Sequence, residues 1–118
     1  MRAAGALFEQ RACAELQRAG LKLLDRNYTT RYGEIDLVML DRDTVAFVEV
    51  RHRLTNSHGH AATTVTASKQ RKLVQTAELW LATHPYYGNH PCRFDVVSYD
   101  GPVDRAEMAW WKQAFDAM

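Results

Sequence analysis

The order of secondary-structure elements in this sequence of 118 residues predicts an α/β fold, with a mixed central sheet flanked by helices. Two kinds of pattern lead to this prediction. Residues 33–40 and 45–51 alternate their side chains with the period of two that is typical of strands. Residues 3–19 and 66–84 place apolar side chains on one stripe with helical spacing. The predicted order is a helix, three strands, a second helix and a further strand.

The first predicted helix spans residues 3–19 and ends before Gly20, because glycine is a common helix terminator. Its inward stripe consists of Ala12, Cys13 and Leu16. Glu9 lies three, four and seven residues before them, so it falls on the same stripe. A glutamate on a buried stripe needs a partner, because burying an unpaired charge is costly. The alternative is that Glu9 reaches water near the helix start or is stabilised by the helix dipole.

A first strand is predicted for residues 21–30, followed by a β-hairpin made of 33–40 and 45–51. The connection between the hairpin strands is short and polar. A register that pairs Leu40 with Val45 makes one face of the hairpin wholly apolar, whereas a slip by one residue would mix the faces. That apolar face consists of Ile35, Leu37, Met39, Ala46, Val48 and Val50.

The same register sets Asp36 directly opposite Glu49 on the other face, with their Cβ atoms roughly 5 Å apart. Two like charges this close repel each other unless a cation lies between them, so the pair indicates a metal site. Acidic side chains on a solvated strand face are the alternative explanation. Together with Glu9 and a backbone carbonyl, the pair suits a hard cation such as Mg²⁺ or Mn²⁺. The two cysteines and the sequence His58-Gly59-His60 lack the spacing of a zinc site.

Residues 54–65 are polar, which predicts a mobile loop of the kind that often contacts substrates. A second helix follows, with Thr66 or Ser68 as its N-cap and an end near residue 85. Lys69 lies at the edge of its inward stripe, one turn before the apolar part begins. That apolar part consists of Leu73, Val74, Ala77, Trp80 and Leu81. Residues 92–99 predict a strand, and residues 108–115 predict a brief strand and a closing helix.

Length and composition are typical of one soluble globular domain covering residues 1–118. No segment approaches the ~20 consecutive apolar residues that a membrane-spanning helix needs. The N-terminal apolar run is too short for a signal peptide, and the two cysteines fit a reducing compartment. We therefore expect a cytoplasmic protein that does not associate with membranes.

The net charge is only +1, but cationic side chains gather between residues 51 and 93. This segment contains six lysines and arginines against one acid, and it holds all five histidines. A basic segment that begins where the acidic hairpin ends could hold phosphates beside the proposed metal, and solvated surface is the alternative. The candidate nucleic-acid contacts are Arg53, Arg71 and Lys72.

The sequence resembles the YraN family of small bacterial proteins, which belongs to the PD-(D/E)XK nuclease superfamily. The resemblance rests on Gly5 with Glu9, Asn27, Gly33-Glu34-Ile35-Asp36-Leu37, Phe47-Val48-Glu49-Val50-Arg51-His52-Arg53, Lys69 and Arg93-Phe94-Asp95-Val96-Val97. It implies a restriction-endonuclease-like αβββαβ core. It also implies that Asp36 and Glu49 bind a Mg²⁺ or Mn²⁺ ion, with the carbonyl of Val50 and Glu9 as further ligands. In such enzymes the ion binds the scissile phosphate and lowers the pKa of an attacking water.

The sequence departs from the superfamily pattern at Arg51, where the motif usually has lysine. Arginine keeps its proton and cannot act as a general base, although it can hold a phosphate or stabilise developing charge. Lys69 could replace the missing amine, or the metal alone could activate the water with Arg51 as the stabilising group. A solvated lysine in the first helical turn is the alternative for Lys69.

The expected function is therefore metal-dependent hydrolysis of DNA phosphodiester bonds. Whether the protein cleaves DNA is left open, because Arg51 replaces the lysine of the motif. One alternative is a nucleic-acid-binding module that keeps the fold without cleaving. Another is an adaptor whose Trp80, Trp110 or Trp111 binds a second protein. Nucleases of this fold often dimerise to reach two strands, so a homodimer is a further expectation to test.

Overall fold

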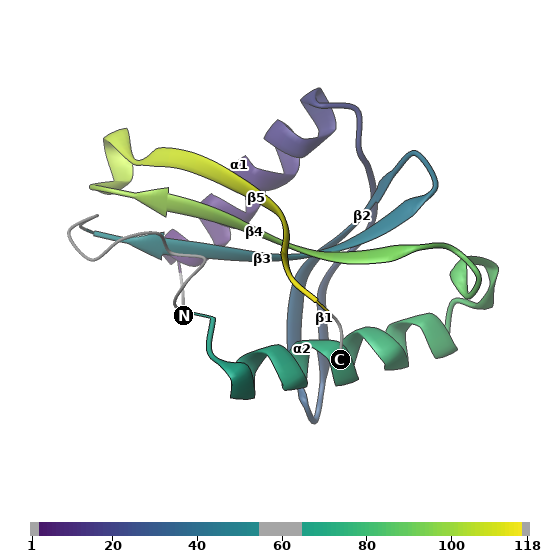
Figure 1. Ribbon diagram of the computed structural model, residues 1–118. Coiled ribbons are helices and arrows are strands. Elements are labelled where there is room, and N and C mark those ends of the chain that lie inside the picture. Colours follow the sequence, from purple (N-terminus) through teal and green to yellow (C-terminus); the bar gives the residue numbers. More distant parts are fainter. Residues whose placement is uncertain (1–2, 55–64, 117–118) are drawn as a thin grey trace.

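The computed structural model describes residues 3–54 and 65–116, and it contains a five-stranded mixed sheet with one helix on each face (Figure 1). The strands lie side by side in the order β1-β2-β3-β4-β5. The α/β class and the mixed sheet predicted from the sequence are confirmed, and the arrangement is consistent with a restriction-endonuclease-like fold. The elements are α1 (Ala3–Arg18), β1 (Lys22–Thr30), β2 (Gly33–Asp41), β3 (Thr44–Arg53), α2 (Ala67–Ala82), β4 (Cys92–Asp100) and β5 (Glu107–Phe115), with short 3₁₀ helices at Pro85–Tyr87 and Val103–Arg105.

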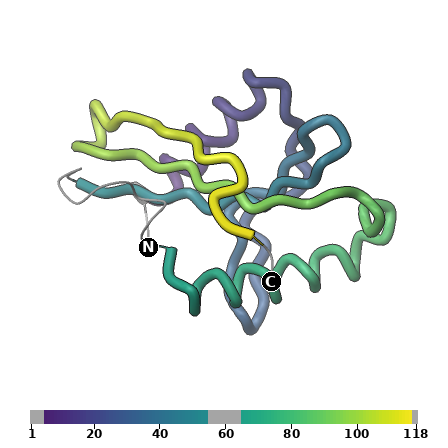
Figure 2. Tube along the Cα trace, viewed as in Figure 1, coloured from purple at the N-terminus to yellow at the C-terminus, as the bar shows by residue number. Residues whose placement is uncertain are grey.

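The connection that contains α2 joins the one parallel pair of neighbouring strands, β3 and β4, and the other neighbours are antiparallel. Parallel strands need a crossover of this kind, because a tight turn can join only antiparallel strands. Figure 2 shows α1 and α2 on opposite sides of the strands. Two buried clusters result, one between the sheet and α1 and the other between the sheet and α2. Among the described residues, neither helix is long and apolar enough to cross a bilayer.

Both helices form as their sequence patterns predict. The inward stripe of α1 is buried and includes Ala12, Cys13, Leu16 and the carboxylate of Glu9. Gly20 follows α1 with a φ of 103°, a left-handed conformation that glycine adopts without steric cost. Thr66 is the N-cap of α2, because its Oγ1 accepts the backbone N–H of Lys69 at 3.1 Å. The predicted loop at residues 54–65 lies mostly outside the described residues.

The hairpin register predicted from the sequence is confirmed only in part. Pairs run from Asp41↔Thr44 to Leu37↔Val48, and among the described residues the ladder between β2 and β3 ends there. The predicted pairs of Asp36 with Glu49 and of Ile35 with Val50 are therefore wrong as ladder pairs. Ile35 packs in the cluster beneath α2, although Leu37, two residues further along, packs beneath α1.

A local bend explains this change of face. The side chain of Asp36 accepts the backbone N–H of Val50 at 2.8 Å, so a carboxylate takes part where regular strand pairing stops. In the neighbouring strand β1, Asn27 has a φ of 53°, which a regular strand does not adopt. Beyond these two positions, Ile35 and its β1 partner Tyr28 both pack with the cluster beneath α2.

The C-terminal segment is a single strand, so the closing helix predicted within residues 108–115 is wrong. Strand β5 pairs with β4 from Asp100↔Glu107 to Phe94↔Phe115. Trp110 packs with the cluster beneath α1 and Trp111 with the cluster beneath α2, which is the alternation of a strand. An apolar aromatic run fits helix or strand equally well from the sequence. The unpaired backbone groups along the edge of β4 decide in favour of a strand.

Candidate active site

Three carboxylates predicted as metal ligands come together from three different elements. Glu9 comes from α1, Asp36 from β2 at the bend, and Glu49 from β3, and their exposed fractions are 8%, 7% and 8%. Glu34, which the sequence analysis did not assign to the site, lies near enough to raise the pKa of both Asp36 and Glu49. The result is a cluster of four carboxyl groups, of which Glu9, Asp36 and Glu49 are largely withdrawn from water.

The pKa of Asp36 is raised to about 8. Burial contributes most, because the charged form loses hydration, and the charge of Glu49 contributes next. The hydrogen bond from the Val50 N–H opposes the shift, while the charges of Glu9 and Glu34 add to it. When no metal ion is bound, Asp36 therefore keeps its proton at neutral pH.

Two cationic side chains approach Glu49 from different elements. Lys69 Nζ and Arg51 Nη1 each lie 3.7 Å from the same oxygen, Glu49 Oε2. Burial raises the pKa of Glu49, and the charges of Lys69 and Arg51 partly offset that rise. Lys69 can reach this point because Thr66 begins α2 beside the cluster. Both distances are longer than a hydrogen bond, so neither Lys69 nor Arg51 forms a tight ion pair with Glu49.

The donor atoms fit a hard divalent cation held by few protein ligands. Among residues 3–54 and 65–116, no three His, Cys, Asp or Glu side chains form a group that could hold an ion. Mg²⁺ is commonly bound by one or two carboxylates together with water and phosphate oxygens, and Asp36 with Glu49 provides such a pair. The backbone N–H of Val50 already donates to Asp36 at 2.8 Å, and because the N–H and C=O of an extended residue point to the same side, the Val50 carbonyl stays a candidate ligand. Glu9 adds charge beside this pair without completing a group of three.

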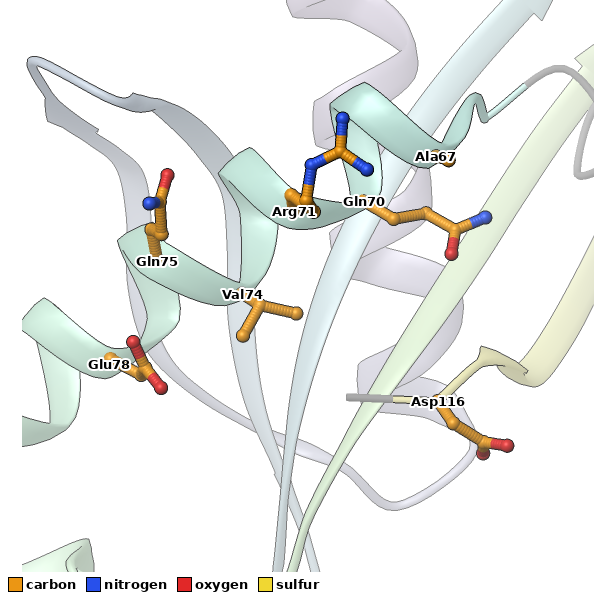
Figure 3. A pocket seen from close by; sticks show the side chains of 7 residues that line it. All are labelled: Ala67, Gln70, Arg71, Val74, Gln75, Glu78 and Asp116. Carbon is orange, nitrogen blue, oxygen red and sulfur yellow. The ribbon is translucent and has the colours of Figure 1, made fainter. Parts of the chain in front are cut away.

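The structure separates the predicted nucleic-acid contacts from one another. Lys72 borders the cluster, since it lines a small hollow of about 30 Å³ together with Glu34 and Lys69. Arg71 is one of the residues that line a different hollow of about 550 Å³, between α2 and the end of β5, and none of the clustered carboxylates lines it (Figure 3). Arg53 is half-buried at the end of β3, and its Nη1 atom has no hydrogen-bond partner among the described residues.

Arg93 has a structural role, so its inclusion in the basic phosphate-holding segment is wrong. Its guanidinium lies 2.9 Å from Asp41 and 2.9 Å from the buried carboxylate of Asp95. Burial acts to lower the pKa of Arg93, but the hydrogen bonds and charges of Asp95 and Asp41 outweigh it and raise the pKa. A side chain held by two carboxylates at the far end of the hairpin is not available to phosphate.

Sequence reasoning missed two residues beside the cluster. Tyr32, in the turn between β1 and β2, lines the same small hollow as Lys69 and Lys72. Its neighbour Arg31 donates a hydrogen bond to the Tyr32 hydroxyl at 2.9 Å. The sequence feature that could have indicated them is an aromatic residue next to an arginine, in a tight turn that precedes the acidic strand.

The sheet order, the two flanking helices and the carboxylates at the strand bend define a protein of the PD-(D/E)XK-like class. The chain matches the family described as "Uncharacterised protein family UPF0102" over residues 8–99. It is 49% identical over 108 residues to a UPF0102 protein of Nitrosomonas europaea, covering 92% of this chain and 89% of that protein. It is 48% identical over 114 residues to one of Pseudomonas putida (96% and 93% covered), and 46% identical over 109 residues to one of Stutzerimonas stutzeri (92% and 91%). The chain belongs to family UPF0102, which is the YraN family that its motifs resemble.

Proposed function

We propose that this protein is a divalent-metal-dependent nuclease that hydrolyses phosphodiester bonds of DNA. The observation that carries the proposal is the position of Glu49, which lies beside buried Asp36 with Lys69 and Arg51 both 3.7 Å from one of its oxygens. Carboxylates next to two cations form a site with complementary groups for both a metal ion and a phosphate.

Asp36 and Glu49 would hold the ion, with the Val50 carbonyl beside them. Their environment supports this role, because burial and, after it, the charge of Glu49 raise the pKa of Asp36 to about 8, and a bound cation would stabilise both carboxylates. A bound Mg²⁺ or Mn²⁺ would supply positive charge to the scissile phosphate and lower the pKa of an attacking water.

Arg51 and Lys69 would have different roles in the hydrolysis. Arg51 keeps its proton and can donate hydrogen bonds to a phosphate oxygen, which stabilises charge that develops during hydrolysis. Lys69 brings to the site an amine of the kind that the motif's usual lysine supplies, so it is the candidate to replace that lysine beside the attacking water. Its side chain is 43% exposed, so it can turn from Glu49 toward a substrate.

A nucleic-acid-binding module that does not cleave is the second candidate. It is favoured by Arg51 at the position of the usual lysine and by the lack of a three-ligand group among the described residues. The adaptor hypothesis loses Trp80 as a contact, because Trp80 is fully buried and donates to Asp25. Trp110 and Trp111 are half-buried and pack against the two core clusters, which leaves less of each ring for a partner.

The test is cleavage of labelled single-stranded, duplex and branched DNA in Mn²⁺, Mg²⁺ and EDTA. We expect cleavage that requires metal and that falls by at least about 100-fold in Glu49→Gln, as expected for loss of an essential charged group. Glu78→Gln makes the same chemical change on the exposed face of α2 and should leave the rate unchanged. DNA that is bound but uncut under all conditions would favour the binding module over the nuclease.

A further inference from the structure

The turn between β1 and β2 is held firmly against α2, next to the carboxylate cluster. Thr30 Oγ1 accepts the Tyr32 N–H at 3.1 Å and lies 3.5 Å from the hydroxyl of Thr76 in α2. Gly33 follows with a φ of 152°, a conformation that residues with a Cβ rarely adopt, and it lies at ordinary contact distance from Thr76 and Lys72 of α2. Figure 1 shows the turn at the lower end of the hairpin, beside α2. The turn therefore has a defined position relative to the helix.

Arg31 and Tyr32 at this turn place a guanidinium group against an aromatic ring. The guanidinium carbon of Arg31 lies 5.0 Å from the centre of the Tyr32 ring, and its Nη2 donates to the Tyr32 hydroxyl at 2.9 Å. Arg31 is exposed and Tyr32 is half-buried, so the pair is anchored on one side and open to solvent on the other. Aromatic rings and guanidinium planes are the side chains on which unpaired bases stack.

The turn and the carboxylate cluster are continuous. Tyr32, Lys69 and Lys72 line one hollow, and the amine of Lys69 in that hollow also lies 3.7 Å from Glu49. From Gly33 to Asp36 is three residues of β2, a distance of about 10 Å along a strand. The turn therefore lies within reach of a nucleotide next to a scissile phosphate bound at the carboxylates.

We propose that the Arg31–Tyr32 turn stacks on an unpaired base next to the scissile phosphate, with Lys72 holding the backbone, so that the substrate is DNA with single-stranded nucleotides at the cleavage point. The inference rests on the proposed nuclease function and deepens it by naming the form of the substrate. Bases inside a duplex have both faces covered by neighbouring bases, so the turn can engage only an unpaired one. Stacking accepts every base, so no sequence preference is expected from it.

The test is DNA binding in EDTA, measured by fluorescence anisotropy with a labelled single strand and the matching duplex. Tyr32→Leu should weaken single-strand binding about tenfold and change duplex binding less than about twofold, whereas Tyr32→Phe should keep both within about twofold. Tyr86→Ala removes an exposed tyrosine at the far end of α2 and should change neither. Lys72 lies on the exposed face of α2. Lys72→Ala should reduce the slope of the logarithm of the binding constant against the logarithm of the salt concentration by about one unit.

Equal single-strand affinity of Tyr32→Leu and Tyr86→Ala would overturn this inference while leaving the nuclease proposal in place. The same holds if Tyr32→Leu weakens single-strand and duplex binding equally. A wild-type protein that neither binds nor cuts any of the DNA forms would overturn both proposals.

Discussion

Asp36 is the residue at which local structure and electrostatics act against each other. Its carboxylate ends the β2–β3 ladder by accepting the Val50 N–H, yet burial and the charges of Glu49, Glu9 and Glu34 disfavour its ionised form. A protein selected only for stability would have a neutral side chain here. A strained carboxylate of this kind is typical of functional sites.

The raised pKa of Asp36 predicts how the stability of the metal-free protein depends on pH. The folded-state pKa is about 8 and the ordinary value is 3.8, so protonation favours the folded state. This contribution is complete below about pH 4 and is lost as pH rises toward 8. Asp36→Asn cannot ionise and can still accept the Val50 N–H. In EDTA, the free energy of unfolding of Asp36→Asn relative to that of the wild type should increase by ~1–3 kcal/mol between pH 5 and pH 8, because each pKa unit corresponds to ~1.4 kcal/mol.

Urea unfolding at the two pH values measures this difference. Asp43→Asn, in the exposed turn between β2 and β3, is the matched control and should follow the wild type. An Asp36→Asn variant with the same pH dependence as wild type would show that the carboxylate is ionised in the folded protein throughout this range.

At the scale of single elements, the beginning of α2 decides where the cationic side of the site lies. Thr66 caps the helix through the Lys69 N–H, and the same residue, Lys69, directs its amine toward Glu49. On strand β3, His52 stacks on Phe8 with ring centres 4.3 Å apart and so joins the strand to α1. The two residues of this stacked pair are distant in the sequence, so only the tertiary structure reveals this role of His52.

Loss of the α2 cap should destabilise the protein without changing its fold. Thr66→Ala removes the acceptor for the Lys69 N–H and should lower the free energy of unfolding by about 1 kcal/mol. Thr66→Ser keeps a hydroxyl at the same position and should recover most of this loss. Urea unfolding of the three proteins distinguishes them, and equal midpoints for Thr66→Ala and Thr66→Ser would contradict the capping role.

At the scale of the whole molecule, the side chain of Asp95 connects strands β4 and β5, at one edge of the sheet, to the β2–β3 hairpin. Its side chain is fully buried in β4 and accepts hydrogen bonds from Arg93, from Trp110 Nε1 at 3.0 Å and from the Gln113 N–H at 3.0 Å. Arg93 extends the network to Asp41 at the β2–β3 hairpin. The network lies where the β4–β5 register shifts between Phe94 and Val96, so it holds an irregular pairing in place.

Asp95→Ala should be strongly destabilising. It leaves the Arg93 guanidinium without its buried partner and two other donors unpaired, a change that typically costs about 3–5 kcal/mol. Asp104→Ala removes a carboxylate from a fully solvated pair with Arg105 and should change stability by less than about 0.5 kcal/mol. Chemical denaturation compares the two variants, and a loss below about 1 kcal/mol for Asp95→Ala would refute the structural role of the network.

Local patterns predicted much of this protein. Period-two alternation gave the hairpin register from Asp41 to Leu37, and helical spacing placed Glu9 on the buried stripe of α1. These two predictions depend on the repeat of one element, which adjacent residues in the sequence reveal. The resemblance offered Lys69 as one replacement for the motif lysine, with a solvated lysine as the alternative, and in the structure its amine lies 3.7 Å from Glu49.

The sequence by itself therefore determined the α/β class, the acidic hairpin and the family to which the chain belongs. Only the tertiary structure decided the bend at Asp36, the strand form of residues 107–115 and the closeness of Tyr32 to Lys69 and Lys72. The physical reason is the same in each case. These features are set by partners from distant parts of the chain, and the free energy of such contacts overrides local preference where the two conflict.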